Sequence, residues 1–162
     1  MTEIPFDRIP LFDDLSNSQL ALLENIFHLC DCQADEVIFE QGDIANYLFI
    51  VIEGSVTIRY KPDDGPELDV TNIQSGGVFG WSAAFGCGTY TSGASCLTNC
   101  KLLRVHGKKL KQLRENHPET GILILERLAT VVAKRLKGSK EHTQVMAFLE
   151  HGLRNGIKPI GG

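Results

Sequence analysis

The feature that most constrains the fold is a series of short β-rich runs, separated by turn-forming clusters, between residues 37 and 105. Valine, isoleucine, phenylalanine, tyrosine and threonine favour strands, whereas clusters of glycine, aspartate and proline favour tight turns. The runs cover residues 37–39, 47–52, 55–60, 68–70 and 101–105. They predict a small all-β sandwich or barrel in this part of the chain.

Helical patterns flank the β-rich region on both sides. Before it, Asp14 and Ser16 are candidate N-caps of a helix whose apolar residues recur at helical spacing. After it, we expect a short helix around Leu110 and a long helix that starts at Pro118. The apolar residues of the first helix are Leu20, Leu22, Leu23, Ile26 and Phe27.

The length of 162 residues and the mass of 17.9 kDa predict one domain rather than two. We expect that domain at residues 11–137, followed by a helical tail with a flexible end at residues 138–162. Glu3 stands where a signal peptide carries cations, and the longest apolar run, residues 47–52, is too short to cross a membrane. These features predict a cytoplasmic protein that does not bind membranes.

Residues 37–56 resemble a known family. Their order of strand, Gly42-Asp43 turn, strand, Gly54 turn and strand is similar to the cyclic-nucleotide-binding domains of the bacterial catabolite activators and of kinase regulatory subunits. The resemblance covers roughly residues 11–137. It implies an α+β fold: an eight-stranded antiparallel β-roll, similar to a jelly roll, with an N-terminal helix, a long C-terminal helix and here a helical tail. Tight corners of such a roll often need the positive φ that glycine adopts at low cost.

The resemblance places the ligand site in a phosphate-binding cassette, a loop and short helix between two strands. In members that bind cyclic nucleotides, a Glu after a Phe-Gly pair contacts the ribose 2′-hydroxyl, and a later Arg pairs with the cyclic phosphate. Trp81 and Tyr90 occupy the corresponding positions in this chain. The candidate ligand-binding residues are Gly76, Gly77, Val78, Phe79, Gly80, Trp81, Ser82, Ala83, Tyr90, Thr91 and Ser92.

The whole cassette region is uncharged. From Val70 to Cys100 the chain has no Asp, Glu, Lys, Arg or His. Because a charge-assisted hydrogen bond contributes about 1.5–3 kcal/mol, the missing carboxylate and guanidinium predict cyclic-nucleotide binding that is tens- to thousands-fold weaker than in those members. Backbone N–H groups and the hydroxyls of Ser82, Thr91 and Ser92 leave a weak or non-standard small-molecule ligand as the expectation.

Two interpretations of Trp81 and Tyr90 remain open. Their rings either fill the cavity that a nucleotide would occupy, because protein interiors avoid voids, or form a pocket for an apolar or flat ligand.

The cysteines and histidines do not form a recognisable metal or catalytic pattern. Five cysteines at irregular spacing indicate reduced thiols rather than a disulfide framework. Cys30-x-Cys32 and Cys96-x-x-x-Cys100 lack the spacing of a metal site, and Cys96 and Cys100 are expected to face one side of a strand as small buried residues. No histidine occurs between residues 37 and 105. We therefore expect no metal, no cofactor and no catalytic residue.

Charge is distributed unevenly along the chain. Residues 1–100 carry three Lys and Arg against fifteen Asp and Glu, whereas residues 101–162 carry thirteen against five. The excess of Lys and Arg in residues 101–162 is a pattern found in proteins that bind nucleic acids. However, in transcription factors of the family a DNA-reading module of some 70 residues follows the long helix, and only about 25 residues follow Lys137 here. We expect no nucleic-acid partner.

The apolar stripe of the long helix is wider than one buried face needs, which predicts a homodimer through this helix. Its expected core is Leu125, Leu128, Val132 and Leu136. The alternative is a monomer in which residues 145–153 cover the stripe.

These expectations favour a non-catalytic sensing or regulatory module that acts through an unidentified protein partner. The alternative is a ligand-independent dimerising scaffold or partner-binding subunit.

Overall fold

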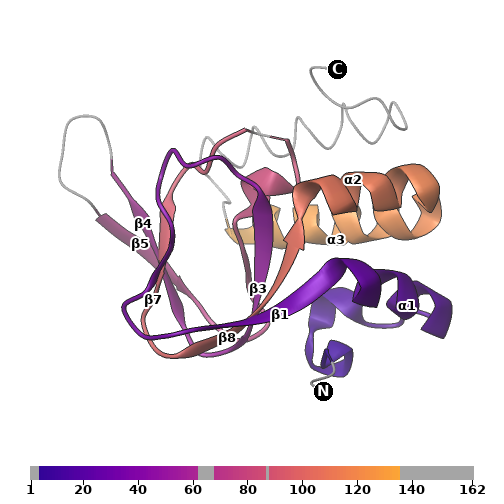
Figure 1. The fold of residues 1–162 in the computed structure, drawn as a ribbon, viewed down its shortest axis with the longest axis horizontal. Helices are drawn as coiled ribbons and strands as arrows, with labels where there is room; N and C mark the ends of the chain where they lie inside the picture. Colours follow the sequence, from indigo (N-terminus) through magenta and orange to yellow (C-terminus); the bar gives the residue numbers. More distant parts are fainter. Residues whose placement is uncertain (1–3, 62–67, 87, 136–162) are drawn as a thin grey trace.

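The structure, a computed structural model, describes residues 4–61, 68–86 and 88–135. Figure 1 shows a β-roll with the helices gathered at one end. The helices are α1 (Asn17–Ile26), α2 (Gly107–Asn116) and α3 (Pro118–Arg135), with short 3-10 turns η1 (Phe6–Arg8), η2 (Pro10–Phe12) and η3 (Trp81–Ala83). The strands are β1 (Phe27–Cys32), β2 (Val37–Phe39), β3 (Tyr47–Glu53), β4 (Val56–Tyr60), β5 (Leu68–Ile73), β6 (Val78–Phe79), β7 (Gly93–Cys96) and β8 (Cys100–His106).

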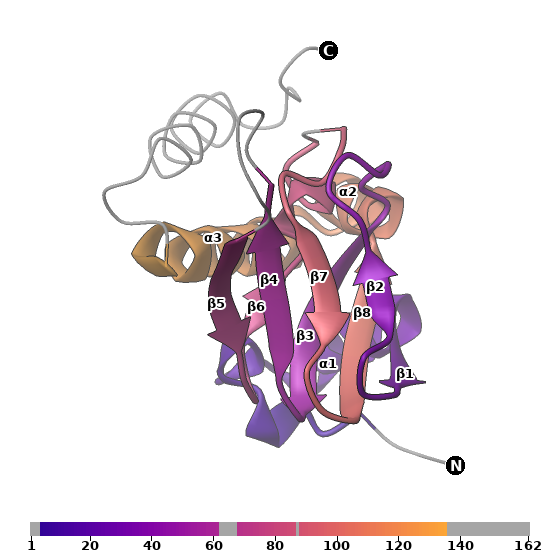
Figure 2. The same cartoon turned by 90° about the vertical axis from the view of Figure 1, so that its left-hand side faces the viewer.

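The eight strands form two antiparallel sheets that face each other (Figure 2). One sheet has the order β1-β8-β3-β6, and the other has the order β2-β7-β4-β5. Leu48 of β3 pairs with Val105 of β8 in the first sheet, and Val56 of β4 pairs with Cys96 of β7 in the second. The predicted α+β fold with an eight-stranded antiparallel roll is confirmed.

Strand β3 explains why the core has two parts. Leu48, Ile50 and Ile52 belong to a cluster shared with the helices, here called the helix cluster, while Phe49 and Val51 belong to a cluster between the two sheets, here called the roll cluster. Alternate residues of a strand point to opposite faces, so β3 is buried on both sides. A strand in this position needs an unbroken apolar sequence, and this is what residues 47–52 supply.

Helix α1 begins at a capping box. The Ser16 hydroxyl accepts a hydrogen bond from the Gln19 backbone N–H, and the Gln19 side chain accepts one from the Ser16 N–H, at 3.2 and 3.0 Å. Of the two predicted caps the chain therefore uses Ser16. The prediction that Phe27 lies on this helix is wrong, because Phe27 is extended and starts β1, where it pairs with Val105.

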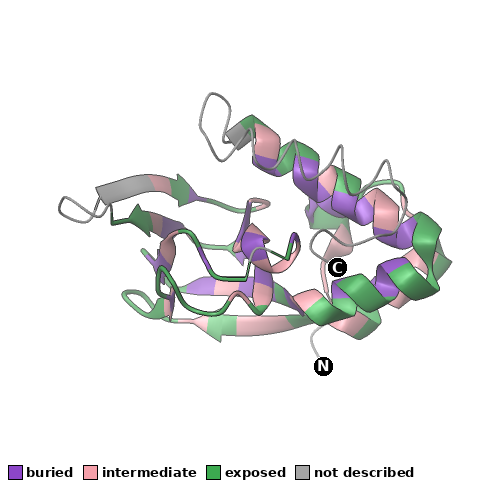
Figure 3. Ribbon diagram, turned by 90° about the horizontal axis from the view of Figure 1, so that it is seen from above, coloured by how far each residue is buried: buried purple, intermediate pink, exposed green. Residues whose placement is uncertain are grey.

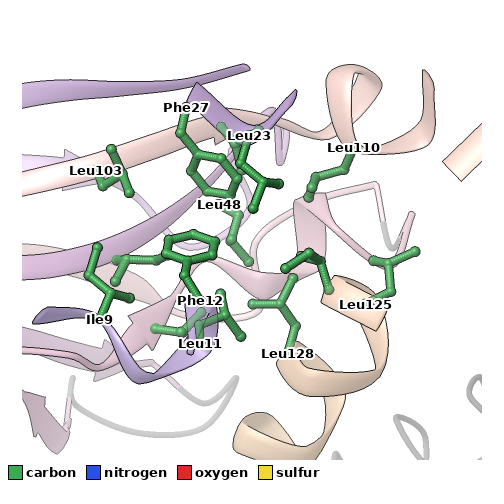
Figure 4. Packing of buried hydrophobic residues seen from close by; sticks show 14 of the residues in the cluster. Ile9, Leu11, Phe12, Leu23, Phe27, Leu48, Leu103, Leu110, Leu125 and Leu128 are labelled. Carbon is green, nitrogen blue, oxygen red and sulfur yellow. The ribbon is translucent and has the colours of Figure 1, made fainter. Parts of the chain in front are cut away.

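The stripe of α3 is covered within the monomer. Leu125 is 5% exposed and Leu128 and Val132 are 0% exposed, in the helix cluster with Leu11 and Leu110 (Figures 3 and 4). Arg127 donates hydrogen bonds to the backbone oxygens of Leu11 and Asp13, at 2.9 and 2.7 Å, and so ties α3 to η2.

The assignment of Leu125, Leu128 and Val132 to a dimer core is therefore corrected. No local sequence pattern predicts that the residues before α1 pack on α3. Leu136, the fourth residue of that set, and the tail at residues 138–162 lie outside the described residues.

The prediction that Cys96 and Cys100 share a strand is also wrong. Cys96 ends β7 and Cys100 begins β8, which belong to different sheets. Among the described residues, no helix is long and apolar enough to cross a membrane.

Candidate functional site

The candidate cassette begins at Gly76 and Gly77, which lead into β6, passes through η3 and ends at Ser92, just before β7. Figure 2 shows β6 and β7 in different sheets of the roll. Gly80 separates β6 from η3 and has a φ of 72°, in the left-handed region. A Cβ at this position would lie 3.0 Å from the Tyr47 backbone oxygen and 3.3 Å from the Phe49 ring. Both the backbone angle and the close approach to β3 therefore require glycine here.

Trp81 begins η3 and packs toward the helices. It is half-buried against the helix cluster, and its ring centre lies 6.3 Å from that of Phe85. Ser82, the next residue, is buried.

Tyr90 lies in the roll cluster instead. It is 6% exposed, and its ring stacks on Phe39 with a centroid distance of 3.6 Å. Its hydroxyl donates to the Tyr47 backbone oxygen at 2.6 Å and accepts from the Tyr47 N–H at 3.0 Å. Burial, together with the negative charge of nearby Asp43, raises the pKa of Tyr90. Trp81 and Tyr90 thus belong to different clusters and do not line one aromatic pocket.

The second part of the cassette is fixed to the loop between β2 and β3. The Tyr90 N–H donates to the backbone oxygen of Asp43 at 2.9 Å, and the Gly42 N–H donates to the backbone oxygen of Tyr90 at 2.9 Å. Thr91, which follows, is exposed, and Ser92 is half-buried. The Asp43 side chain of this loop places a negative charge near Tyr90. A cyclic phosphate, which is an anion, is bound by positive charge instead.

The sequence profile described as "Cyclic nucleotide-binding domain" matches residues 30–117, more than half of the chain. The chain belongs to the cyclic nucleotide-binding domain family. A curated relative from Haemophilus influenzae, described as "cAMP-activated global transcriptional regulator CRP", is 32% identical over 124 residues. The match covers 76% of this chain and 54% of that protein, so the chain spans about half the length of this curated relative.

Two solved structures share the fold. A cyclic nucleotide-binding protein from Geobacter metallireducens has 25% identity and a TM-score of 0.71, over 82% of this chain and 98% of that chain. The catabolite activator protein of Thermus thermophilus has 24% identity and a TM-score of 0.69, over 93% and 73% respectively. The segment described above therefore belongs to a cyclic nucleotide-binding domain, and Trp81 and Tyr90 are aromatic side chains within it.

Four cysteine thiols of this family member come together at one end of the roll. Cys32 of β1 is the direct cross-strand partner of Cys100 of β8, and the Cys96 thiol lies near both. Burial raises the pKa of the Cys32 thiol to about 11, and burial also raises the pKa values of the Cys30 and Cys96 thiols. The three thiols are therefore protonated at neutral pH, and a protonated thiol is a poor nucleophile and metal ligand. No group of three or more metal-ligand side chains placed to hold an ion is found in the described part of the chain.

A cleft that the sequence did not predict lies where the cassette meets α2. It has a volume of about 290 Å³ and is bounded by Asn46, by residues 83–86 and by the first turns of α2. A Cβ on Gly107 would lie 2.4 Å from the Ala83 backbone oxygen, so η3 and the start of α2 are in direct contact. This contact brings together two segments that line the cleft, and no local sequence pattern predicts it.

Proposed function

We propose that this chain is a non-catalytic regulatory domain whose nucleotide site no longer binds cyclic AMP or cyclic GMP tightly. The observation that carries the proposal is the uncharged cassette, in which Trp81 and Tyr90 stand at the positions of the ribose-binding carboxylate and the phosphate-binding guanidinium. The regulatory role is supported by the curated relative, whose description is that of a transcriptional regulator.

The positions of the two rings strengthen the argument. Tyr90 is held by stacking on Phe39 and by two hydrogen bonds to Tyr47, so it does not swing out to leave room for a phosphate. Loss of a bidentate guanidinium–phosphate pair and of a carboxylate–ribose contact removes several charge-assisted hydrogen bonds of about 1.5–3 kcal/mol each. What remains for a ligand is neutral: backbone N–H groups and the hydroxyls of Thr91 and Ser92.

Calorimetric titration of the full chain with cyclic AMP and cyclic GMP tests the proposal. We expect dissociation constants no tighter than the high micromolar range. A submicromolar constant for either nucleotide would contradict it.

A charge-restoring variant tests the assignment of the site. Because Tyr90 is part of the core, the arginine is better placed at the neighbouring exposed Thr91. Trp81→Glu with Thr91→Arg should improve cyclic-nucleotide affinity at least about tenfold, since each tenfold corresponds to about 1.4 kcal/mol. The control, Trp81→Gln with Thr91→Gln, has side chains of similar size without charge and should give no gain.

A ligand-independent scaffold is the second candidate, and the packing of Tyr90 inside the roll favours it. In that case the domain acts through a protein partner or a second copy. If neither the original chain nor the charge-restoring variant binds a cyclic nucleotide, this second candidate is favoured.

A further inference from the structure

Arg114 of α2 is a buried cation without a counter-charge. Its exposed fraction is 8%, and its Nε has no hydrogen-bond partner in the part of the chain that the structure describes. The salt bridge found among the described residues joins Arg8 and Glu53 and does not involve Arg114. A buried N–H donor left without a hydrogen-bond partner is unfavourable, so the Arg114 Nε–H is a donor that a ligand in an adjoining cleft can satisfy.

The position of Arg114 is fixed by close helix packing. Gly121 of α3 approaches so closely that a Cβ there would lie 2.4 Å from the Arg114 Cα. This contact sets the position of the Arg114 backbone, and the Arg114 side chain lines the 290 Å³ cleft between the cassette and α2.

The other polar side chains of the cleft are cationic or neutral. Lys108 and Lys111 project from the same helix, while His106 and Asn46 complete the polar wall. No Asp or Glu lines the cleft among the described residues. The cleft runs along α2 from Gly107 at the N-terminal end of the helix, where the helix dipole favours negative charge, to Arg114 in its last turn.

We propose that this cleft binds a small phosphate-bearing metabolite, with Arg114, Lys108 and Lys111 around the phosphate group. A planar guanidinium and two ammonium groups along one cleft suit a phosphate, because they can supply several charge-assisted hydrogen bonds. The volume is at the lower end of the range for ligand pockets, which fits a small molecule. The site is distinct from the position of the cyclic phosphate in the family, because that position is held by Tyr90 in the roll cluster.

The location gives such a ligand a mechanical role. One wall of the cleft is Ala83–Gly86 of the cassette segment, and the other is the first turns of α2. A bound phosphate would bridge the two and hold them together. The site does not depend on cyclic-nucleotide binding, so its test is independent of the test of the function proposed above.

Titration of the full chain with inorganic phosphate at constant ionic strength tests the proposal. The guanidine Nε–H signal of Arg114, assigned from its loss in Arg114→Gln, is followed by two-dimensional ¹⁵N NMR. We expect a saturable shift with a millimolar dissociation constant, and weaker binding of malonate, which presents carboxylates.

Charge-matched variants separate a built site from general attraction. Lys111→Gln removes an exposed cation that lines the cleft, and Lys109→Gln removes an exposed cation of α2 that does not. We expect Lys111→Gln to weaken phosphate binding about tenfold, as measured from the Arg114 signal, and Lys109→Gln to leave it within about twofold. If Arg114→Gln fails to fold and leaves the Arg114 signal unassigned, calorimetric titration of the original chain and the two lysine variants with phosphate gives the same comparison. A shift that does not saturate, an equal loss in both lysine variants, or tighter binding of malonate than of phosphate would overturn the proposal.

Discussion

At the scale of single residues, the identity of residue 90 decides whether its side chain can face a ligand or packs inside the roll. An arginine that binds a phosphate must present its head to a ligand, whereas Tyr90 turns its ring into the roll and uses its hydroxyl to satisfy both backbone groups of Tyr47. Tyr90 therefore acts as a structural residue within the candidate cassette.

Tyr90→Phe should destabilise the fold while keeping the ring on Phe39. It removes the hydroxyl that pairs with the Tyr47 N–H and C=O, and a buried polar group left unpaired costs about 1–3 kcal/mol. We expect the midpoint of urea unfolding to fall with no change in the slope of the transition. Tyr60→Phe is the matched control, because Tyr60 is 40% exposed, and should change the midpoint little. Equal midpoints for Tyr90→Phe and the original chain would show that the two hydrogen bonds do not stabilise the fold.

At the scale of elements, strands with strong local patterns were predictable and strands defined by their partners were not. β3 was predictable because both of its faces are buried and the whole run is apolar. β1 continues the helical spacing of α1 and contains His28 and Asp31, and β7 is made of small residues, so neither has a local strand signal. Both are held in place by pairing with strands far away in the sequence.

The start of α1 was predictable because capping is local, and the same locality makes it testable. Ser16→Ala removes the hydroxyl that accepts from Gln19 and should lower the free energy of unfolding by about 1 kcal/mol. Ser18→Ala, at an exposed position within the helix, is the control and should change stability by a few tenths of a kcal/mol. Thermal unfolding of both variants measures the difference, and an equal effect of the two would mean that the cap does not stabilise the protein.

At the scale of the whole molecule, the family and the roll could be predicted from sequence, but the cleft and the helix interface could not. Gly-punctuated strand patterns are local and specified the roll. The environments of Arg114 and Leu128 instead depend on which segments pack over α2 and α3, namely η2, the cassette and the neighbouring helix. The periodicity of apolar residues within one helix does not predict how close that helix lies to other elements.

We still propose a homodimer, now through the outer face of α3. With Leu125, Leu128 and Val132 used inside the monomer, Val131, 37% exposed, is the exposed large apolar side chain among the described residues of α3. A second copy of the chain fits this face, because the acidic first part and basic second part of one chain complement those of another. Added salt should therefore weaken the association.

Val131→Glu should weaken that dimer without unfolding the monomer. The side chain is exposed in one chain, so the charge is solvated there, but it would be desolvated between two copies of α3. Sedimentation equilibrium at tens of micromolar protein should give twice 17.9 kDa for the original chain and a mass close to 17.9 kDa for the variant. Val37→Glu places the same change at a 53% exposed position on β2 and should leave the dimer intact. A mass of 17.9 kDa for the original chain, or equal dissociation by both variants, would reject an interface on α3.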